Sequence, residues 1–375
     1  MKKVLLGTTA LVAAGAIGAG QAQAKFDVSV NGNYYAAYGY VDEDTDNRHS
    51  QAINEDFEVH FRIMQTLDNG ITVGGRVELE GLQSGDQVDE RWLFFRGGFG
   101  EIRVGDEDDA RKLKSYTAPS ASAFLFGANS PYFSFFNRDT ATTVVGTGAT
   151  ATTVVTGNVV SSNSTTPNLE NDSSKIIYFT PTFAGFGLAA SYAPDSTQDR
   201  TGFGTGPDNN NLENAWSVGA DWSGEFGGVT IGAGGGYSAA SDEVGNDDPS
   251  IWAAGVNVGF AGFTIGGSIA IGDDTNVLGF NGYSVSEATV WDAGITYNFE
   301  AVTVGINYSY GEYEDSTDGE DDELTIVNLE GGYALGDGVL LGAFVGYFDY
   351  EEGGGTLGAD DNTGWQAGIG AGLDF

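Results

Sequence analysis

The sequence predicts an all-β protein, a sixteen-stranded antiparallel transmembrane β-barrel with short periplasmic turns and long external loops. Three observations predict it: segments of about ten residues that alternate apolar with small or polar residues, an N-terminal export signal, and short turns that alternate with long polar loops. Segment 365–375 (WQAGIGAGLDF) has Trp365, Ile369 and Leu373 on one face and Gln366 on the other. A period of two over this length is typical of a tilted strand that crosses a bilayer.

The N-terminus has the features of an export signal. Two lysines precede an apolar stretch, and Ala22-Gln23-Ala24 then matches a small-x-small cleavage site. We expect a signal peptide over 1–24, removed after Sec-dependent export, and a barrel domain over 25–375. The rest of the chain has no run of about 18 apolar residues that could form a transmembrane helix. Its 59 glycines disfavour helices in general, so strands are expected to cross the membrane.

Charge and composition exclude other classes of protein. The net charge of −38 argues against nucleic acid as a partner, because phosphate binding requires the opposite sign. The chain contains no cysteine, so no disulfide holds it together. A barrel whose strands satisfy every backbone group needs none. These features suit a protein of the outer membrane, in contact with its lipid and lipopolysaccharide.

Short and long connections alternate along the chain. The short turns are rich in glycine and asparagine, which supply the positive φ that tight hairpins need. They lie at 68–70, 97–100, 183–185, 224–228, 260–262, 299–301 and 335–338. The long loops carry most of the acidic runs and lie at about 42–50, 81–88, 106–173, 194–212, 240–249, 272–285, 314–322 and 351–362. Seven short turns and eight long loops connect sixteen strands, and the last strand is expected to close against the first, around 26–40.

The two faces of these strands differ in character. In segment 302–310, Val304 and Ile306 lie on one face, and Thr303 and Gly305 lie on the other. Phenylalanines beside the short turns are expected to form an interfacial girdle: Phe183, Phe186, Phe226, Phe260, Phe263, Phe299 and Phe375. A sixteen-stranded barrel is too wide for side chains to fill. The opposite faces, rich in Gly, Ser, Thr, Asn and Ala, therefore predict a water-filled lumen.

Ionisable residues concentrate on the predicted inner faces of strands two, three and five. They are Glu58, His60, Arg62, Arg76, Glu78, Glu80, Glu101 and Arg103. Strand four is ambiguous, because Arg91 and Arg96 fall on opposite faces. Placing Trp92 and Phe94 against lipid puts Arg91 in the lumen and leaves Arg96 near the periplasmic rim. An arginine ladder on adjacent strands produces a strong local field inside a pore and predicts a role in ion selection. The alternative is that these arginines only neutralise the nearby glutamates.

The third long loop, about 106–173, is by far the longest. It opens with the acidic run 106–109, and it then becomes aromatic and small over 124–136. An apolar stretch of this kind is expected to lie against the inner wall. Its second half, 139–172, contains the repeat ATTVV and is expected to be an exposed excursion or a small hairpin.

Three segments carry a resemblance to a known family. Segment 91–105 (RWLFFRGGFGEIRVG), segment 175–194 (KIIYFTPTFAGFGLAASYAP) and the terminal Phe375 resemble the general porins of Gram-negative outer membranes, which are sixteen-stranded trimeric diffusion channels. The resemblance implies a homotrimer for passive diffusion of small hydrophilic solutes and ions. It also implies that the third loop folds into the lumen and narrows it, with acidic residues of the loop facing a wall of arginines.

By position, the residues that match this constriction fall into two sets. The basic wall is Arg62, Arg76, Arg91 and Arg103; the acidic residues are Asp106, Glu107, Asp108, Asp109, Glu58 and Glu78. This chain departs from the family at the loop tip, 115–134, which has no carboxylate. The run 106–109 is expected to substitute for it.

Other functions were weighed. Only His49 and His60 could serve a hydrolytic site, and the chain has no cysteine and no Gly-x-Ser-x-Gly elbow, so we expect no enzyme. Asp42, Asp44 and Asp46 copy the start of a calcium loop, but the glycine and bidentate glutamate of an EF-hand are missing. A weak Ca²⁺ site in the external loops is the only cofactor expected.

The alternatives to general diffusion are a channel specific for a sugar, phosphate or dicarboxylate, and a surface adhesin or structural barrel without an open pore. The acidic mouth predicts weak cation selectivity that fades with salt. The arginine ladder predicts the opposite near the constriction.

Overall fold

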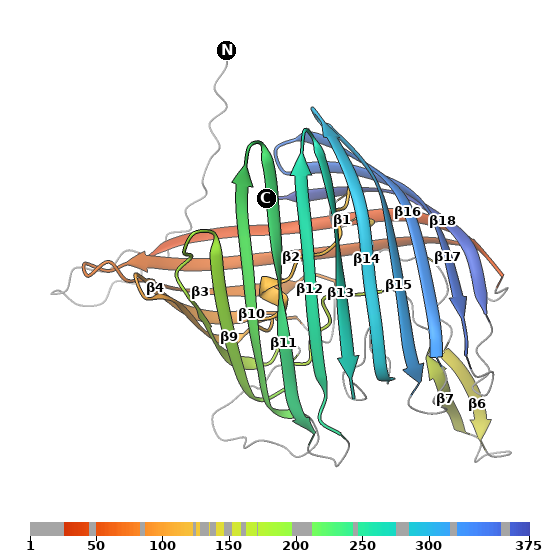
Figure 1. Ribbon diagram of the computed structural model, residues 1–375, viewed down its shortest axis with the longest axis horizontal. Helices are drawn as coiled ribbons and strands as arrows, with labels where there is room; N and C mark the ends of the chain where they lie inside the picture. Colours follow the sequence, from red (N-terminus) through yellow and green to blue (C-terminus); the bar gives the residue numbers. More distant parts are fainter. Residues whose placement is uncertain are drawn as a thin grey trace.

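The computed structural model describes residues 26–44, 50–82, 87–122, 125–127, 135, 140–145, 152–158, 163–170, 172–196, 212–242, 247–274, 285–315, 321–353 and 361–375. Sixteen strands in these residues form a closed antiparallel barrel, which confirms the predicted fold class (Figure 1). They are β1 (Asp27–Glu43), β2 (Gln51–Thr66), β3 (Thr72–Glu80), β4 (Arg91–Gly97), β5 (Gly100–Asp106), β8 (Ser174–Phe179), β9 (Phe186–Asp195), β10 (Leu212–Phe226), β11 (Val229–Asp242), β12 (Ser250–Phe260), β13 (Phe263–Asp273), β14 (Val285–Phe299), β15 (Val302–Asp315), β16 (Asp321–Gly336), β17 (Val339–Glu351) and β18 (Asn362–Asp374).

Three further elements lie between β5 and β8. The 3₁₀ turn η1 covers Lys112–Lys114, and the strands β6 (Thr140–Val145) and β7 (Thr152–Asn158) form a separate two-stranded sheet. The ATTVV repeat therefore forms a small hairpin, one of the two forms predicted for it. No helix in the described residues is long or apolar enough to cross a membrane.

The barrel closes between its first and last strands, as predicted. Tyr38 of β1 pairs with Ile369 of β18 in an antiparallel register. The amide of Phe375 donates to the carbonyl of Gly32 at 3.0 Å, and the amide of Gly32 donates back at 2.9 Å. Closure leaves no free sheet edge, which a bilayer would not tolerate because lipid cannot satisfy unpaired backbone groups.

The outer face carries the large apolar side chains. Phe183, Phe226, Phe260 and Phe299 are all exposed beside the short turns, as expected of an interfacial girdle. The turn after β12 shows how sharply these hairpins reverse: Gly262 has φ of +87°, a conformation that glycine adopts without steric cost. The short turns therefore mark the periplasmic end of the barrel.

The wall is lower on one side. Strands β3, β4, β5 and β8 have 9, 7, 7 and 6 residues, whereas β14 has 15 and β16 has 16. All of these strands reach the same periplasmic end. The external rim is therefore low over β3–β8, here called the low wall, and higher over β14 to β16, here called the high wall.

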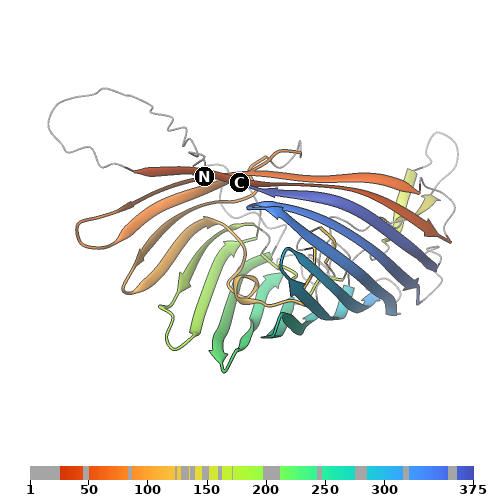
Figure 2. The same ribbon diagram turned by 90° about the horizontal axis from the view of Figure 1, so that it is seen from above.

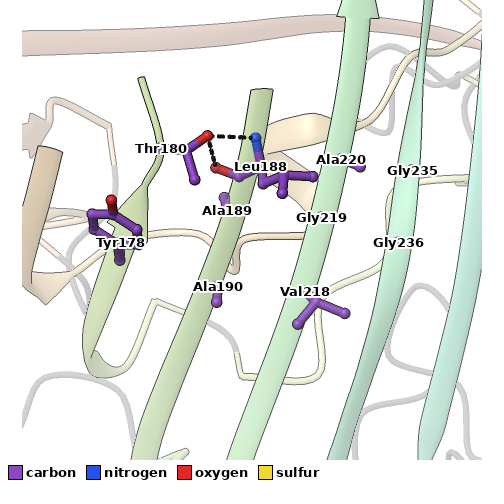
Figure 3. Close-up of a pocket in the computed structure, with 10 residues that line it drawn as sticks. All are labelled: Tyr178, Thr180, Leu188, Ala189, Ala190, Val218, Gly219, Ala220, Gly235 and Gly236. Carbon is purple, nitrogen blue, oxygen red and sulfur yellow. Dashed lines mark hydrogen bonds between the residues drawn. The ribbon is translucent and has the colours of Figure 1, made fainter. Parts of the chain in front are cut away.

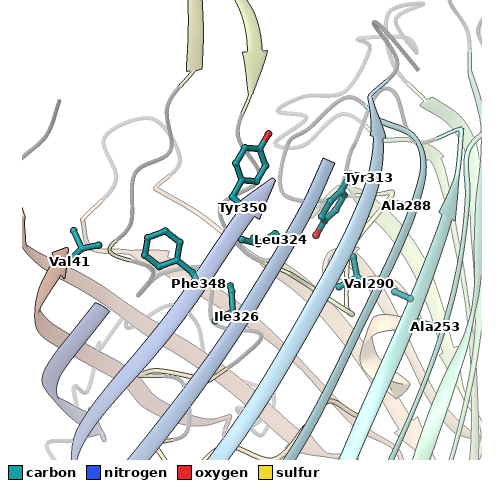
Figure 4. Close-up of a cluster of buried hydrophobic side chains, with 10 residues drawn as sticks. Val41, Ala253, Ala288, Val290, Tyr313, Leu324, Ile326, Phe348 and Tyr350 are labelled. Carbon is teal, nitrogen blue, oxygen red and sulfur yellow. The ribbon is translucent and has the colours of Figure 1, made fainter. Parts of the chain in front are cut away.

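The inner face is less uniform than the sequence suggested. Near the external ends of β14 to β17, lumen-facing Tyr313, Leu324, Phe348 and Tyr350 are buried in one apolar cluster (Figure 4). The expectation of small neutral residues was therefore wrong for this region. Side chains here are covered by other segments of the chain, so the high wall does not present them to water.

Candidate functional site

The described residues 107–122, 125–127, 135, 163–170 and 172–173, which belong to the chain between β5 and β8 and are here called the inner loop, lie inside the barrel, whereas the β6–β7 hairpin projects beyond the strand ends (Figure 1). The amide of Ala118 donates to Asp292 on β14 at 3.1 Å, and the amide of Phe135 donates to Gln366 on β18 at 3.1 Å. In Figure 2 the chain that follows β5 runs within the ring of strands. The predicted folding of the third loop into the lumen is therefore observed, and the loop lies on the inner faces of β9 to β18.

Glu330 is the densest attachment point of the inner loop. This buried carboxylate on β16 accepts hydrogen bonds from the amides of Ala121 at 3.1 Å and Ser122 at 3.2 Å. It also accepts from the hydroxyls of Ser120 at 2.6 Å and Ser122 at 2.8 Å. A buried charge is tolerated only when such donors satisfy it. Glu330 therefore fixes the position of the loop.

Asp292 on β14 anchors the preceding segment of the loop in the same way. It accepts from the amide of Ala118 and, at 2.7 Å, from the hydroxyl of Ser268. Thr165, on the returning segment of the loop, also donates to it at 3.3 Å. The sequence reasoning missed Asp292 and Glu330. The sequence signal that could have identified them is a single acidic residue among the small residues on the inner face of a membrane-spanning strand.

Glycines make the inner wall flat enough for the loop. A Cβ at Gly255 would overlap the carbonyl group of Tyr116, and a Cβ at Gly332 would overlap that of Ala121. Gly219 approaches the backbone of the loop in the same way. The abundance of glycine on the inner faces thus has a packing cause, close approach of one backbone to another.

The apolar segment of the loop covers the closing strand. Leu125 and Phe126 form a buried cluster with Phe344 and Tyr35, and the ring of Phe135 stacks 6.1 Å from that of Phe344. The expectation that this stretch lies against the inner wall is therefore met for its described residues. The apolar side chains point into the wall and away from the passage.

The four-acid run does not face the arginines across the passage: its first two acids pair with Arg91 and Arg103 of the same wall. Asp106 lies on the outer face of β5, where its carboxylate is 2.8 Å from the Arg91 guanidinium and accepts from the hydroxyl of Ser174. Glu107 is buried and pairs with Arg103 at 2.5 Å. Both acids are neutralised on the low wall itself, at the start of the loop.

The next two acids hold the loop to itself. Asp108 pairs with Lys112 at 2.6 Å and accepts from Asn168 at 3.1 Å. Asp109 accepts from the hydroxyl of Ser238 at 2.6 Å and from the amide of Lys112, also at 2.6 Å. The run therefore attaches the start of the loop to the barrel wall and to the loop itself, and Lys112, to which the sequence analysis assigned no role, is one of its partners.

Two buried cations join the outgoing and returning segments of the loop. Arg111 is fully buried; it donates to the hydroxyl of Ser238 at 2.9 Å and to the carbonyl of Pro167. Lys175 on β8 donates to the carbonyl of Glu107 and lies 3.7 Å from the Glu170 carboxylate. Burial raises the pKa of Glu170 to about 7, the charge of Asp109 adds to the shift, and Lys175 opposes it.

The opposite wall, β1 to β5, carries the ionisable residues. The guanidinium of Arg62 lies 5.6 Å from the ring centre of Phe94, and that of Arg103 lies 4.4 Å from the ring centre of Trp92. Arg76 is on the same inner face, opposite Arg62 in the β2–β3 register. The structure therefore brings Arg62, Arg76 and Arg103 together on the lumen side.

Arg91 is on the other side of the wall, so its predicted orientation was wrong. Leu93 and Phe95 are 58% and 46% exposed on the outer face, whereas Trp92 and Phe94 are 7% and 0% exposed. Arg91 alternates with Trp92 and therefore points outward, to Asp106. Both faces of β4 have aromatic residues, and the inner pair is buried beneath the arginines instead of facing lipid.

Most lumenal arginines are already paired. Arg76 forms an ion pair with Glu78, and Arg103 lies 2.7 Å from Glu101 in addition to Glu107. Among the described residues, Arg62 has no carboxylate partner. Glu58 and Glu78 belong to the same wall as the arginines, so they do not form an acidic side across the passage.

Charge on this wall is arranged along the barrel axis. On β2, Asp56 and Glu58 lie toward the external end and Arg62 toward the periplasmic end, with His60 between them. The facing segment of the inner loop, 115–122, contains no Asp, Glu, Lys or Arg. A solute that enters from outside therefore meets carboxylates first and arginines second.

Two hollows lie on the outer face and so outside the passage. One, of about 430 Å³, is lined by apolar and small residues of β8 to β11, including Tyr178, Leu188 and Val218 (Figure 3). The other, of about 560 Å³, extends over β2 to β8 and includes Leu93 and the Arg91–Asp106 pair. Both are open to lipid or to a neighbouring protein.

Three groups of described residues could hold a metal ion: Glu58, His60 and Glu78; Asp56, Glu58 and Glu80; Glu90, Asp108 and Asp172. Within the described residues, Asp42 and Asp44 belong to none of these groups. Asp46 lies outside the described residues, as do residues 1–25 with the expected signal peptide. The calcium site and the signal peptide therefore stay predictions.

Comparisons with known proteins bear on the family and the fold. A family model described as "Gram-negative porin" matches residues 7–353. No curated protein sequence matches the chain.

Among solved structures, the chain is similar to a loop L8 deletion mutant of OmpT, an outer membrane protein of Vibrio cholerae (TM-score 0.59, 18% identity, covering 93% of this chain and 99% of that chain). It is also similar to the anion-selective porin from Comamonas acidovorans (TM-score 0.59, 15% identity, covering 94% of this chain and 100% of that chain). A third similar structure is the outer membrane channel DcaP of Acinetobacter baumannii (TM-score 0.61, 14% identity, covering 96% of this chain and 100% of that chain). At these identities the likeness establishes the fold.

The role of Glu330 can be tested by Glu330→Gln. The amide keeps the shape but loses the charge, and hydrogen bonds to charged groups contribute about 1.5–3 kcal/mol each. We expect the free energy of unfolding in urea to fall by about 1–3 kcal/mol, and single-channel currents to become larger and noisier as the loop leaves the wall. Glu55→Gln, on the outer face, is the control; equal behaviour of the two variants would contradict the assignment.

Glu170 predicts a pH dependence of the attachment of the loop. Its folded pKa of about 7 lies above the ordinary 4.5, so the folded state holds the proton more tightly than the unfolded state. The contribution of Glu170 protonation to the free energy of unfolding is therefore full below about pH 4.5, falls between about pH 4.5 and 7, and is lost above about pH 7. Melting temperatures measured from pH 4 to 8 should show this decline relative to Glu170→Gln. Parallel pH profiles of the two proteins would count against it.

Proposed function

The chain belongs to the family of Gram-negative porins, and from this premise we propose which ions its channel favours and how its subunits assemble. The protein is an outer-membrane channel for diffusion. Its selectivity is what we propose: weak preference for cations, set by the carboxylates of the β1–β5 wall and by the acidic external loops. The observation that carries the proposal is the unequal pairing of charge in the lumen.

Inside the passage the arginines are largely neutralised and some carboxylates are not. Arg76 and Arg103 each have a glutamate partner at ion-pair distance. In contrast, Asp56 and Glu58 have no lysine or arginine at that distance in the described residues. Since Arg62 is the one lumenal arginine of β2 to β5 without such a partner there, the local balance is negative at the external side. The overall charge of −38 acts in the same direction.

The other functions considered have less support. A sugar-specific slide requires exposed aromatic rings; in the described part of the stretch 124–136, Phe126 is buried against Phe344 and Phe135 packs against the same ring. A hydrolytic site at His60 requires a hydroxyl nucleophile, whereas its ring nitrogens contact carboxylates and Arg76. We therefore propose that the protein is not an enzyme. Incubation of the purified protein with esters and phospholipids should give no turnover.

The assembly proposed is a homotrimer that buries the low wall. OmpT of Vibrio cholerae is described in a trimer form. Here the outer face of β2 to β8 combines short strands, a hollow of about 560 Å³ and the Arg91–Asp106 ion pair. A charged pair that faced acyl chains would be costly, and contact with neighbouring subunits would shield it. Lipid, lipopolysaccharide and Ca²⁺ at the acidic external loops are proposed contacts of the remaining surface.

Ion preference can be measured from reversal potentials across a planar bilayer under a KCl gradient. A unit charge 5–10 Å away is worth about 0.4–0.8 kcal/mol in water, or roughly a 2–4-fold change in local ion concentration. We expect Arg62→Gln to raise the cation-to-anion permeability ratio by about this factor, and Glu58→Gln to lower it. Both effects should shrink with salt.

Glu55→Gln serves as the matched control, because Glu55 is on the same strand but on the outer face. It should leave the reversal potential unchanged. Anion selectivity of the unmodified protein would refute the proposed preference.

The trimer face can be tested by cross-linking, because the chain has no cysteine of its own. Leu93→Cys places a thiol in the β2–β8 hollow, and Leu188→Cys places one in the β8–β11 hollow. With a short bis-maleimide we expect covalent dimers from the Leu93 variant only. Cross-linking of the Leu188 variant alone would assign the interface to the other face.

A further inference from the structure

His60 occupies the boundary between the carboxylates and the arginines of the β1–β5 wall that lines the passage. It lies on β2 two residues from Glu58, so the two side chains project from the same face of the strand. Across the ladder, Glu78 of β3 is the direct partner of His60. Strand geometry therefore brings one imidazole and two carboxylates together inside the lumen.

The three donor atoms converge. The Nε2 atom of His60 lies 2.7 Å from Oε2 of Glu58 and 3.1 Å from Oε2 of Glu78. Ligand atoms of all three residues lie within 4.8 Å of one another. In tetrahedral zinc sites, nitrogen and carboxylate ligands are about 2.0–2.2 Å from the metal, which places them roughly 3.3–3.5 Å apart. Small side-chain rotations would reach that geometry.

We propose that Glu58, His60 and Glu78 form a binding site for a divalent transition-metal ion of the Zn²⁺ class in the wall of the passage. One nitrogen and two carboxylates leave a fourth position for water, as three-ligand zinc sites do, and the side chains of His60 and Glu58 are partly exposed. Imidazole distinguishes this site from the oxygen-only sites that Ca²⁺ and Mg²⁺ prefer. The site does not depend on the proposed ion selectivity.

The surroundings favour a cation. Asp56 and Glu80 flank the site, and with Glu58 they form a second group whose ligand atoms lie within 4.8 Å of one another. Among the described residues, the lysine or arginine at ion-pair distance from Glu58, His60 or Glu78 is Arg76, which pairs with Glu78. The local charge is therefore negative without a metal, and a divalent ion would relieve the repulsion among the carboxylates.

Arg76 competes with the metal. Its Nη2 atom lies 3.0 Å from Nδ1 of His60 and can only donate, so Nδ1 accepts and Nε2 carries the proton of the neutral ring. Metal binding at Nε2 transfers that proton, through solvent, to Nδ1. The Arg76 donor must then turn away from Nδ1. Occupancy of the site thus moves an arginine of the passage and adds positive charge to the wall.

The experiment uses the purified full chain in detergent, with Zn²⁺ titrated in a calorimeter, and the same protein in planar bilayers with micromolar ZnCl₂. We expect one Zn²⁺ per chain, reversible reduction of the current and a shift of selectivity toward anions. His60→Gln should weaken binding at least 10-fold. His49→Gln, which removes the other histidine of the chain, should not change it. Arg76→Gln should bind Zn²⁺ several-fold more tightly, a gain that misfolding would not produce.

Ca²⁺ and Mg²⁺ at the same concentrations should not reduce the current, and any Ca²⁺ binding at the external loops should be the same in the unmodified protein and in His60→Gln. Zinc binding that survives in His60→Gln, Ca²⁺ binding that is lost in His60→Gln, or no zinc binding to the unmodified protein would overturn the proposal. Because calorimetry does not require conduction, failure of the metal site and failure of the channel would be recognised separately.

Discussion

The position of the passage depends on hydrogen bonds between the inner loop and carboxylates buried in the opposite wall. A sixteen-stranded barrel is too wide for its own side chains to fill, so a segment of chain must narrow it. Glu330 and Asp292 accept backbone amides and hydroxyls of that segment. Each acid would be costly to bury alone, and each is stable because the loop supplies donors. The inner-face glycines then allow close contact of the two backbones.

One consequence is that the loop covers β9 to β18 and leaves β1 to β5 to line the passage. The loop contributes a neutral surface over 115–122, so charge is concentrated on a single wall. Carboxylates lie nearer the external end and arginines nearer the periplasmic end, with His60 at the boundary. The field inside the lumen therefore varies along the barrel axis, and the same segregation creates the convergent donors at His60.

The sequence was sufficient for features that depend on period and turn chemistry: the strand number, the closure of β18 on β1 and the outward girdle of phenylalanines. The sequence was insufficient where a strand could place either of its two faces toward the lumen and still satisfy the alternation of apolar and polar residues. In β4 both faces carry aromatic residues, and only packing of Trp92 beneath Arg103 decides that Arg91 points outward. The position of the run 106–109 was misassigned because the fold pairs Asp106 and Glu107 with arginines of the same wall. The hydroxyl of Ser238, which bonds to Asp109, is distant in the sequence and unremarkable there.

The most direct test of this account is the accessibility of single cysteines, since the chain has none of its own. Arg62→Cys lies on the lining wall, and Ser268→Cys lies beneath the inner loop, where Thr165 contacts Ser268 at 2.6 Å. A charged, membrane-impermeant thiol reagent added to open channels should modify the Arg62 variant rapidly, with a change in current, and leave the Ser268 variant unmodified. Equal rates for the two variants, or faster reaction beneath the loop, would contradict the account.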